Sequence, residues 1–101
     1  MKTAMKVLLL NNANERSDDG GIKLTAEKLP GSEHAPHRVK LIWEGAETDR
    51  IKVLRNDEEI SELPNSGHYV DNTGESGSAT YHYQICETDS GACSNKVTVS
   101  F

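Results

Sequence analysis

The chain of 101 residues is poor in aromatic side chains and has no long apolar run. With one Trp, one Phe and three Tyr, most of the core of a single domain of this length must come from Val, Leu and Ile. No run approaches the roughly 20 apolar residues of a membrane span. The 11 Lys plus Arg against 16 Asp plus Glu give a net charge of −5, which argues against nucleic acid as a partner, because phosphate binding rests on Lys and Arg.

The sequence also lacks a catalytic motif. Residues 74–78, Gly-Glu-Ser-Gly-Ser, only imitate the Gly-x-Ser-x-Gly nucleophile elbow, because no strong strand precedes them and no helix follows. A cysteine nucleophile activated by a histidine is disfavoured as well, since His82 is expected on an outer strand face and both cysteines are expected to be bridged. We therefore predict that the chain is not an enzyme and has no catalytic or cofactor-binding residue.

The residues that could bind a metal ion are scattered along the sequence rather than clustered. The four histidines lie in one loop and on two expected strands, so they do not converge, and we interpret them as surface residues: His34, His37, His68 and His82. The acidic pairs at 18–19 and 58–59 lack the repeated oxygen ligands and the glycine of a calcium loop. We predict no metal site.

The chain does have two cysteines, Cys86 and Cys93, one at each edge of a six-residue loop. They could form a disulfide, half of a metal site or two free thiols, but a zinc site normally needs four ligands and closely spaced cysteine pairs. Cysteines at the two ends of a hairpin loop lie opposite each other, close to bonding distance. We expect a disulfide, which persists in an oxidising compartment, and hence a secreted or periplasmic protein.

Residues 1–21 differ in composition from the rest of the chain. Their start is basic and then apolar, like a signal peptide, but the apolar run is shorter than the roughly 7–15 residues required and no small-residue cleavage site follows. We interpret 1–21 as an extension or linker with at most one short strand at 6–10. A disulfide without a signal peptide indicates that the chain comes from a longer exported precursor.

Residues 22–101 consist of short runs that alternate between apolar and polar residues, separated by turn residues. Alternation of period two is typical of strands with one buried face. The expected strands are 22–26, 39–43, 50–55, 58–60, 68–71, 81–86 and 97–101. A helix at 56–63 is rejected because the segment is acidic and runs into Pro64. The pattern predicts an all-β fold, an antiparallel β-sandwich of about seven strands.

One face of these strands should form a single core. It comprises Val39, Leu41, Trp43, Ile51, Val53, Tyr81, Tyr83, Ile85, Val97 and Val99. Trp43 is in register with the inward residues, and Tyr81 stands where sandwich folds place a corner tyrosine that bonds to the loop backbone. Tyr69 is expected to pack as well, although an exposed aromatic beside Asp71 would suit carbohydrate. Tyr69 and Asp71 are therefore the candidate ligand contacts.

The last two strands present a conflict of register. If Cys86 faces Cys93, unbroken pairing sets Tyr83 opposite Lys96 and turns Val97 towards water. A one-residue slip reverses every side chain, so burial should oppose that pairing. One extra residue restores Tyr83 opposite Val97, and we predict a bulge or break at 94–96.

The order of these cues resembles a known family. Val39-x-Leu41-x-Trp43 before Gly45, and Ile51-x-Val53-x-Arg55, resemble the second and third strands of a fibronectin type III domain, and residues 67–71, 80–87 and 93–101 continue the match. The set is similar to the immunoglobulin-like, fibronectin type III-like accessory domains of secreted bacterial proteases, especially subtilisin-like ones, and of some glycan-degrading enzymes. One departure is Asn56-Asp57 in place of the Asn-Gly of a tight turn, which predicts a looser hairpin.

The resemblance implies a noncatalytic, monomeric module that spaces, stabilises or presents the catalytic domain of an exported hydrolase. Its partner would be that domain or an extracellular polymer. The chain carries no catalytic domain, so no activity transfers to it. Two alternatives remain open: a binding module for an extracellular polysaccharide or protein, and a small protease inhibitor that uses the loops at one end of the sandwich.

Overall fold

The computed structural model describes residues 21–31 and 34–101. The predicted linker and the short strand at 6–10 lie outside these residues. The described part forms seven strands and no α-helix: β1 (Lys23–Lys28), β2 (Arg38–Glu44), β3 (Arg50–Arg55), β4 (Glu58–Pro64), β5 (His68–Asn72), β6 (Thr80–Glu87) and β7 (Val97–Ser100). The segment rejected as a helix is a turn followed by β4, which is longer than the predicted strand at 58–60.

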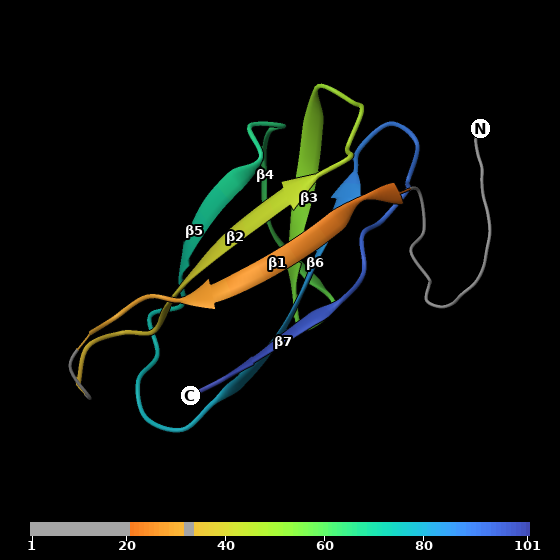
Figure 1. The fold of residues 1–101 in the computed structure, drawn as a ribbon. Helices are drawn as coiled ribbons and strands as arrows, with labels where there is room; N and C mark the ends of the chain where they lie inside the picture. Colours follow the sequence, from red (N-terminus) through yellow and green to blue (C-terminus); the bar gives the residue numbers. More distant parts are fainter. Residues whose placement is uncertain (1–20, 32–33) are drawn as a thin grey trace.

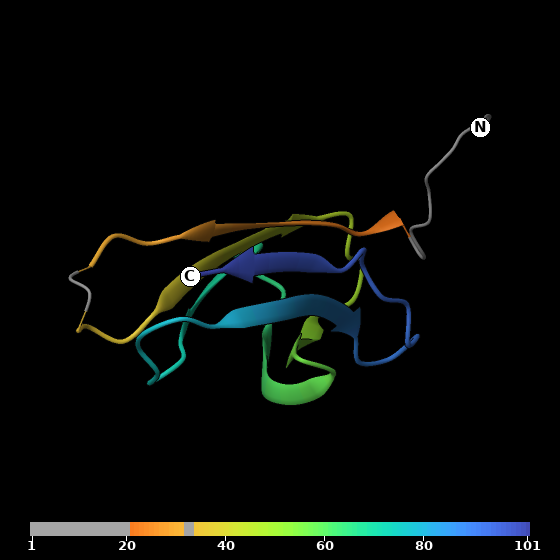
Figure 2. The same cartoon turned by 90° about the horizontal axis from the view of Figure 1, so that it is seen from below.

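The strands build two antiparallel sheets that pack face to face (Figure 1). One sheet has the order β1-β2-β5 and the other the order β4-β3-β6-β7. The two layers are seen edge-on when the molecule is turned (Figure 2). The predicted β-sandwich of about seven strands is confirmed.

The core lies between the sheets and comes from the inward residues of both. It comprises Ile22, Leu24, Val39, Leu41, Trp43, Ile51, Val53, Tyr81, Tyr83, Ile85 and Val99. Val97, expected in this set, is only partly buried and packs against it. Ile22 and Leu24 join from the start of the first sheet and extend the predicted core to β1.

The terminal hairpin changes register where the sequence predicts it. Cys86 pairs with Cys93 as an isolated bridge, whereas Tyr83 pairs with Val97 within the ladder of β6 and β7. One extra residue separates the two pairings, and residues 94–96 belong to no strand. The predicted break therefore keeps the apolar face of β7 inside while the cysteines remain opposite each other.

The hairpin between β3 and β4 is tighter than expected. Asn56 and Asp57 both have positive φ, 55° and 68°, and the flanking Arg55 and Glu58 pair directly. Two left-handed residues in a two-residue loop make a type I′ turn. The expectation of a looser hairpin is wrong, because Asn and Asp tolerate this conformation and Asn56 Oδ1 also accepts a hydrogen bond from the backbone of His82 at 2.9 Å.

Side chains fasten β1 to β7 along one side of the sandwich. The Asn95 amide spans the gap, because its Oδ1 accepts from Leu24 N at 2.9 Å and its Nδ2 donates to Leu24 O at 3.1 Å. Farther along, Lys28 Nζ donates to Ser100 O at 2.9 Å. β1 and β7 run the same way, so β1 starts at one end of a body 48 × 27 × 20 Å in extent and β7 ends towards the other (Figure 2).

Candidate functional site: a pocket beside His37 and Phe101

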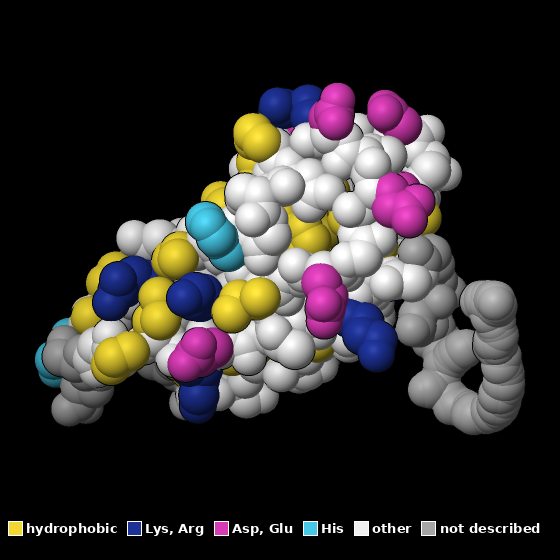
Figure 3. All heavy atoms as spheres, turned by 45° about the horizontal axis from the view of Figure 1, so that its top comes forward, with side chains coloured by type: hydrophobic (Ala, Val, Ile, Leu, Met, Phe, Trp, Pro, Cys, Tyr) yellow, Lys and Arg dark blue, Asp and Glu magenta, His cyan; other side chains and the backbone are white. Residues whose placement is uncertain are grey.

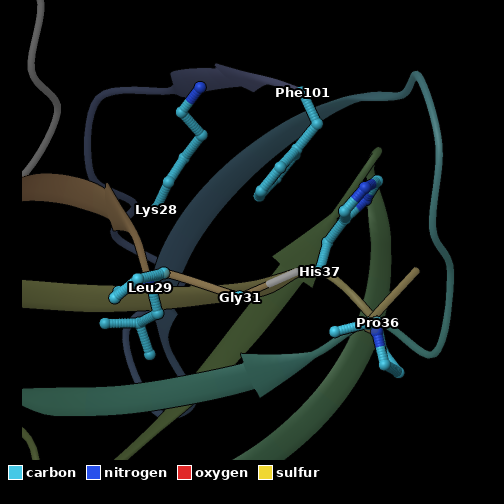
Figure 4. Close-up of a pocket in the computed structure, with 8 residues that line it drawn as sticks. Lys28, Leu29, Gly31, Pro36, His37 and Phe101 are labelled. Carbon is cyan, nitrogen blue, oxygen red and sulfur yellow. The ribbon is translucent and has the colours of Figure 1, made fainter. Parts of the chain in front are cut away.

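A pocket of about 330 Å³ opens at the end of the sandwich where β1 leads towards β2 and β7 stops (Figure 4). It is lined by Lys28, Leu29, Pro30, Gly31, Ala35, Pro36, His37 and Phe101. This volume is at the lower end of the roughly 300–1,000 Å³ typical of small-molecule sites. The lining comes from the last residue of β1, from the connection between β1 and β2, and from Phe101.

Two prolines explain why the chain opens here instead of making a tight hairpin. Pro30 and Pro36 have no backbone N–H, so the ladder of β1 and β2 cannot continue through them. The ladder ends at the bond from Leu29 N to Arg38 O, 3.0 Å long. The Arg38 guanidinium also donates to Pro30 O at 3.1 Å, which holds the start of the connection against β2.

One wall of the pocket is an aromatic stack. The His37 ring lies parallel to the Phe101 ring, with centroids 3.9 Å apart and an interplanar angle of 7°. Tyr81 meets Phe101 edge to face at 5.9 Å, and Lys28 Nζ lies 5.3 Å from the centroid of the Phe101 ring. Such stacked and cation–π contacts add to the burial of the rings. They fix the end of the chain against the connection between β1 and β2.

The Tyr81 hydroxyl links this stack to the connection between β5 and β6. It lies 2.9 Å from His37 Nδ1 and donates to Glu75 Oε1 at 3.0 Å. A phenol has one proton, so when it donates to Glu75 the His37 Nδ1–H must donate to the phenol oxygen. Burial raises the pKa of Tyr81. The sequence predicts for Tyr81 a corner hydrogen bond to the loop backbone, whereas the hydrogen bonds of its hydroxyl go to side chains.

Two nitrogen groups give the pocket its polar chemistry. His37 is 9% exposed, and no described residue pairs with its Nε2. The Lys28 ammonium forms no ion pair with a carboxylate of the described residues, and its hydrogen bond to Ser100 O leaves further donors free. The remaining lining is mainly apolar. The free donors of the Lys28 ammonium and this apolar lining can therefore accept an apolar group that carries an acid.

Asp71, a predicted ligand contact, lies inside the molecule. It is 4% exposed, and its Oδ2 accepts from Arg55 Nη1 and from the Tyr83 hydroxyl, each at 2.7 Å. Burial and the nearby Asp71 raise the pKa of Tyr83. The three side chains tie β5 to β3 and β6, across the two sheets. An exposed ligand carboxylate at Asp71 does not match this burial, and its role here is to join the layers.

Trp43 and Tyr69 also contribute to packing and do not form an exposed binding surface. Trp43 is 4% exposed, and its indole N–H donates to Asn65 Oδ1 at 2.8 Å. Tyr69 is partly buried and packs against the core. The structure does not bring Tyr69 into the pocket beside His37.

The predicted disulfide between Cys86 and Cys93 is confirmed. It lies next to Glu87, whose carboxylate accepts hydrogen bonds from the backbone of Glu47 at 2.6 Å and from the Ser90 hydroxyl. These hydrogen bonds, the one from Glu47 first, lower the pKa of Glu87. The bridged loop is thereby fastened to the connection between β2 and β3, at the end of the sandwich opposite the pocket.

Residues 21–31 and 34–101 contain no group of three or more His, Cys, Asp or Glu side chains placed to hold a metal ion. In the same residues, no helix is long and apolar enough to cross a membrane.

No family model, no curated protein and no solved structure matches this chain.

The two residues at the centre of the site are not apparent from the sequence. His37, expected at the surface, is buried, and no sequence pattern connects Phe101 with the loop after β1. The only signal was indirect: a corner tyrosine at Tyr81 needs a hydrogen-bond partner. Nothing in the local sequence names His37 as that partner, because 44 residues separate the two.

Proposed function

We propose that this chain is a noncatalytic accessory β-sandwich of an exported bacterial hydrolase, which spaces, stabilises or presents the catalytic domain. The observation that carries the proposal is the lengthwise course of the chain. β1 starts at one end of a body 48 Å long and β7 ends towards the other. A module of this shape, fastened along its length by Asn95 and Lys28, holds whatever is joined to its two ends at a set separation.

Two further features support the family and the compartment. β4 pairs with β3 in the larger sheet, whereas the fourth strand of constant-type immunoglobulin domains lies in the other sheet. This difference favours the fibronectin type III side of the resemblance. The disulfide between Cys86 and Cys93 suits an oxidising compartment.

The accessory role is tested on the native protein. An antiserum against residues 22–101 is used on the culture medium and periplasm of the source bacterium. The expected antigen is a polypeptide much longer than the sandwich, with protease or glycan hydrolase activity that copurifies with it. An antigen of the size of the sandwich, without such activity, would overturn the proposal.

The spacing role is tested by fusing donor and acceptor fluorescent proteins directly before residue 22 and directly after residue 101, without residues 1–21. The matched control replaces residues 22–101 with a Gly/Ser linker of equal residue number, which behaves as a flexible coil. The sandwich should give a narrow distance distribution and the linker a broad one. Equal distributions would contradict a spacing role.

The pocket beside His37 favours a second candidate function, the binding of an extracellular protein or polymer through an acidic group with an apolar neighbour. Hexanoate serves as the probe, followed by amide chemical shifts. We expect shifts around Lys28 and Phe101, which Lys28→Gln abolishes. Lys23→Gln is the matched control, because Lys23 is exposed at the far end of the same strand. The absence of shifts in the unmodified chain would exclude this function.

Binding to insoluble polymers and proteases separates the remaining alternatives. An accessory module whose partner is the catalytic domain alone should leave protease rates unchanged and should remain in the supernatant when mixed with chitin or cellulose. Retention on a polymer would support the polysaccharide-binding alternative. Stoichiometric inhibition of a protease would support the inhibitor alternative.

A further inference from the structure

The two open sheets of the sandwich leave four edges, and three of them are covered or blocked. The edges of β1 and β7 face each other and are joined through Asn95 and Lys28. The edge of β4 carries Glu58, Glu59, Glu62 and Pro64, and its pairing with β3 is irregular after Val53. Charges, proline and bulges are the devices that keep edge strands from pairing with other chains.

The fourth edge, that of β5, has no bulge, no proline and no exposed charged side chain, because the Asp71 carboxylate is buried and paired with Arg55. The strand His68–Asn72 contains no lysine and no proline, and its register with β2 is unbroken. β5 forms the outer border of the smaller sheet, and within residues 21–31 and 34–101 no strand lies beyond it (Figure 1).

The hydrogen bonds at the two ends of β5 show which of its backbone groups are free. Trp43 N donates to Gly67 O at 3.0 Å, and Thr73 N donates to His37 O at 2.9 Å. Hydrogen-bonded residues alternate along an antiparallel pair, so Tyr69 and Asp71 also bond to β2. The intervening residues direct their N–H and C=O groups away from β2, towards the free edge: His68, Val70 and Asn72. The His68 carbonyl already accepts from the Ser66 hydroxyl at 3.1 Å, and its second lone pair can accept from a further donor.

The same residues present uncharged side chains on the outer face of the smaller sheet. Val70, at the centre of β5, is 46% exposed, and its neighbours on this face are His68 and Asn72. Figure 3 shows this face, with hydrophobic side chains exposed among charged ones. The one carboxylate of the strand, that of Asp71, points inward and is neutralised by Arg55 at 2.7 Å. The edge therefore offers no charge to a charged partner.

We propose that β5 is a self-association edge, at which a second copy of this chain pairs antiparallel about a two-fold axis through Val70. This register sets Val70 opposite Val70 and His68 opposite Asn72 of the other copy, and each of these pairs exchanges two backbone hydrogen bonds. No like charges meet. A two-fold interface must be self-complementary, and the symmetric arrangement of free groups about Val70 meets that requirement. Two three-stranded sheets become one continuous sheet.

The association should be weak, because only the five residues of β5 take part. An interface below the size of stable complexes points to a dissociation constant of roughly 0.1–1 mM. The net charge of −5 on each copy adds a repulsion that salt screens, so added NaCl should strengthen the pairing. Self-association does not depend on the accessory role, and it departs from the monomer expected from the sequence.

The test combines sedimentation equilibrium with amide hydrogen exchange on the full chain, from about 0.02 to about 2 mM protein. The mass should rise from monomer towards dimer over this range. The amides of His68, Val70 and Asn72 should become protected as concentration rises, whereas those of Tyr69 and Asp71 are protected throughout. A monomer at every concentration, or protection that does not alternate along β5, would overturn the proposal.

Val70→Lys is the disrupting variant, since lysine is a common guard of edge strands. Ile42→Lys is the matched control: Ile42 is 43% exposed on the same face but belongs to the central strand β2. We expect dimer loss with Val70→Lys alone. If the dimer is instead lost with Ile42→Lys and retained with Val70→Lys, the two copies associate through the outer faces of their sheets, and the proposal of edge pairing is wrong. The exchange pattern of the unmodified chain tests the proposal even if a variant fails to fold.

Discussion

Replacing Arg55 with Met would leave the Asp71 carboxylate without its cation between the two sheets. The Asp71 side chain is 5% exposed and that of Arg55 is 26% exposed, with 2.7 Å between Oδ2 and Nη1. Removing one member of a buried ion pair is costly because the other charge stays out of water. The two members differ in burial, so the two single replacements should differ in cost.

The magnitudes follow from that difference. Loss of a partner of a fully buried charge costs about 3–5 kcal/mol. Arg55→Met should cost about 3 kcal/mol, at the lower end, because the Tyr83 hydroxyl still donates to Asp71. Asp71→Asn should cost only about 1 kcal/mol, since water can reach the Arg55 guanidinium and the Asn oxygen still accepts from Tyr83. The double variant contains no buried charge without a partner and should be more stable than Arg55→Met alone.

Urea unfolding followed by Trp43 fluorescence measures these differences, with the free energy obtained by linear extrapolation. A loss of about 3 kcal/mol corresponds to a fall of about 12–24 °C in the melting temperature for a domain of this size. The reasoning fails if Arg55→Met stays within about 1 kcal/mol of the unmodified chain. It also fails if the second replacement, Asp71→Asn, lowers the stability of Arg55→Met further.

Four more outcomes are expected. Trp43→Ala should lower the free energy of unfolding by about 3–5 kcal/mol in a denaturant titration, and an emission maximum typical of exposed Trp in the unmodified native chain would refute its burial. Reducing the bond between Cys86 and Cys93 should cost about 2–3 kcal/mol without changing the fold; unchanged stability after reduction, or loss of the native amide spectrum, would contradict this. The pKa of Glu87 is lowered in the folded state, so its contribution to the free energy of unfolding is present above the pKa of an unfolded Glu and is lost as pH falls through the folded pKa. Glu87→Gln should therefore lower the free energy of unfolding at pH 7, and by less and less as the pH is lowered. A loss of stability that stays constant with pH would count against this. The pKa of Tyr83 is raised in the folded state, so its contribution to stability is complete below the unfolded pKa of about 10 and is lost above it. In an absorbance titration Tyr83 should therefore ionise only as the chain unfolds, and ionisation of Tyr83 in the native state would contradict the raised pKa.

The candidate site was less predictable than the fold because its members share no local pattern. Alternation could place Trp43 and Tyr81 inward, since period two alone assigns a side chain to one face of a strand. It could not pair Tyr81 with His37, which stands in a proline-rich connection without periodicity. It also misjudged Asp71, because a carboxylate within the polar segment 68–72 is typical of a surface. Its burial depends on Arg55, which only the packing of two sheets brings near.

The sequence by itself determined the strands, most of the core, the disulfide and the break at 94–96. Each rests on neighbours in the chain: alternation assigns faces, turn residues end strands, and the apolar faces of β6 and β7 can meet beside a Cys86–Cys93 bridge in only one register. Only the tertiary structure decided the stack of His37 on Phe101, the burial of Asp71 and the free edge of β5. These depend on which strands become neighbours and which are left at a border, and strand pairing is settled by packing across the whole sandwich.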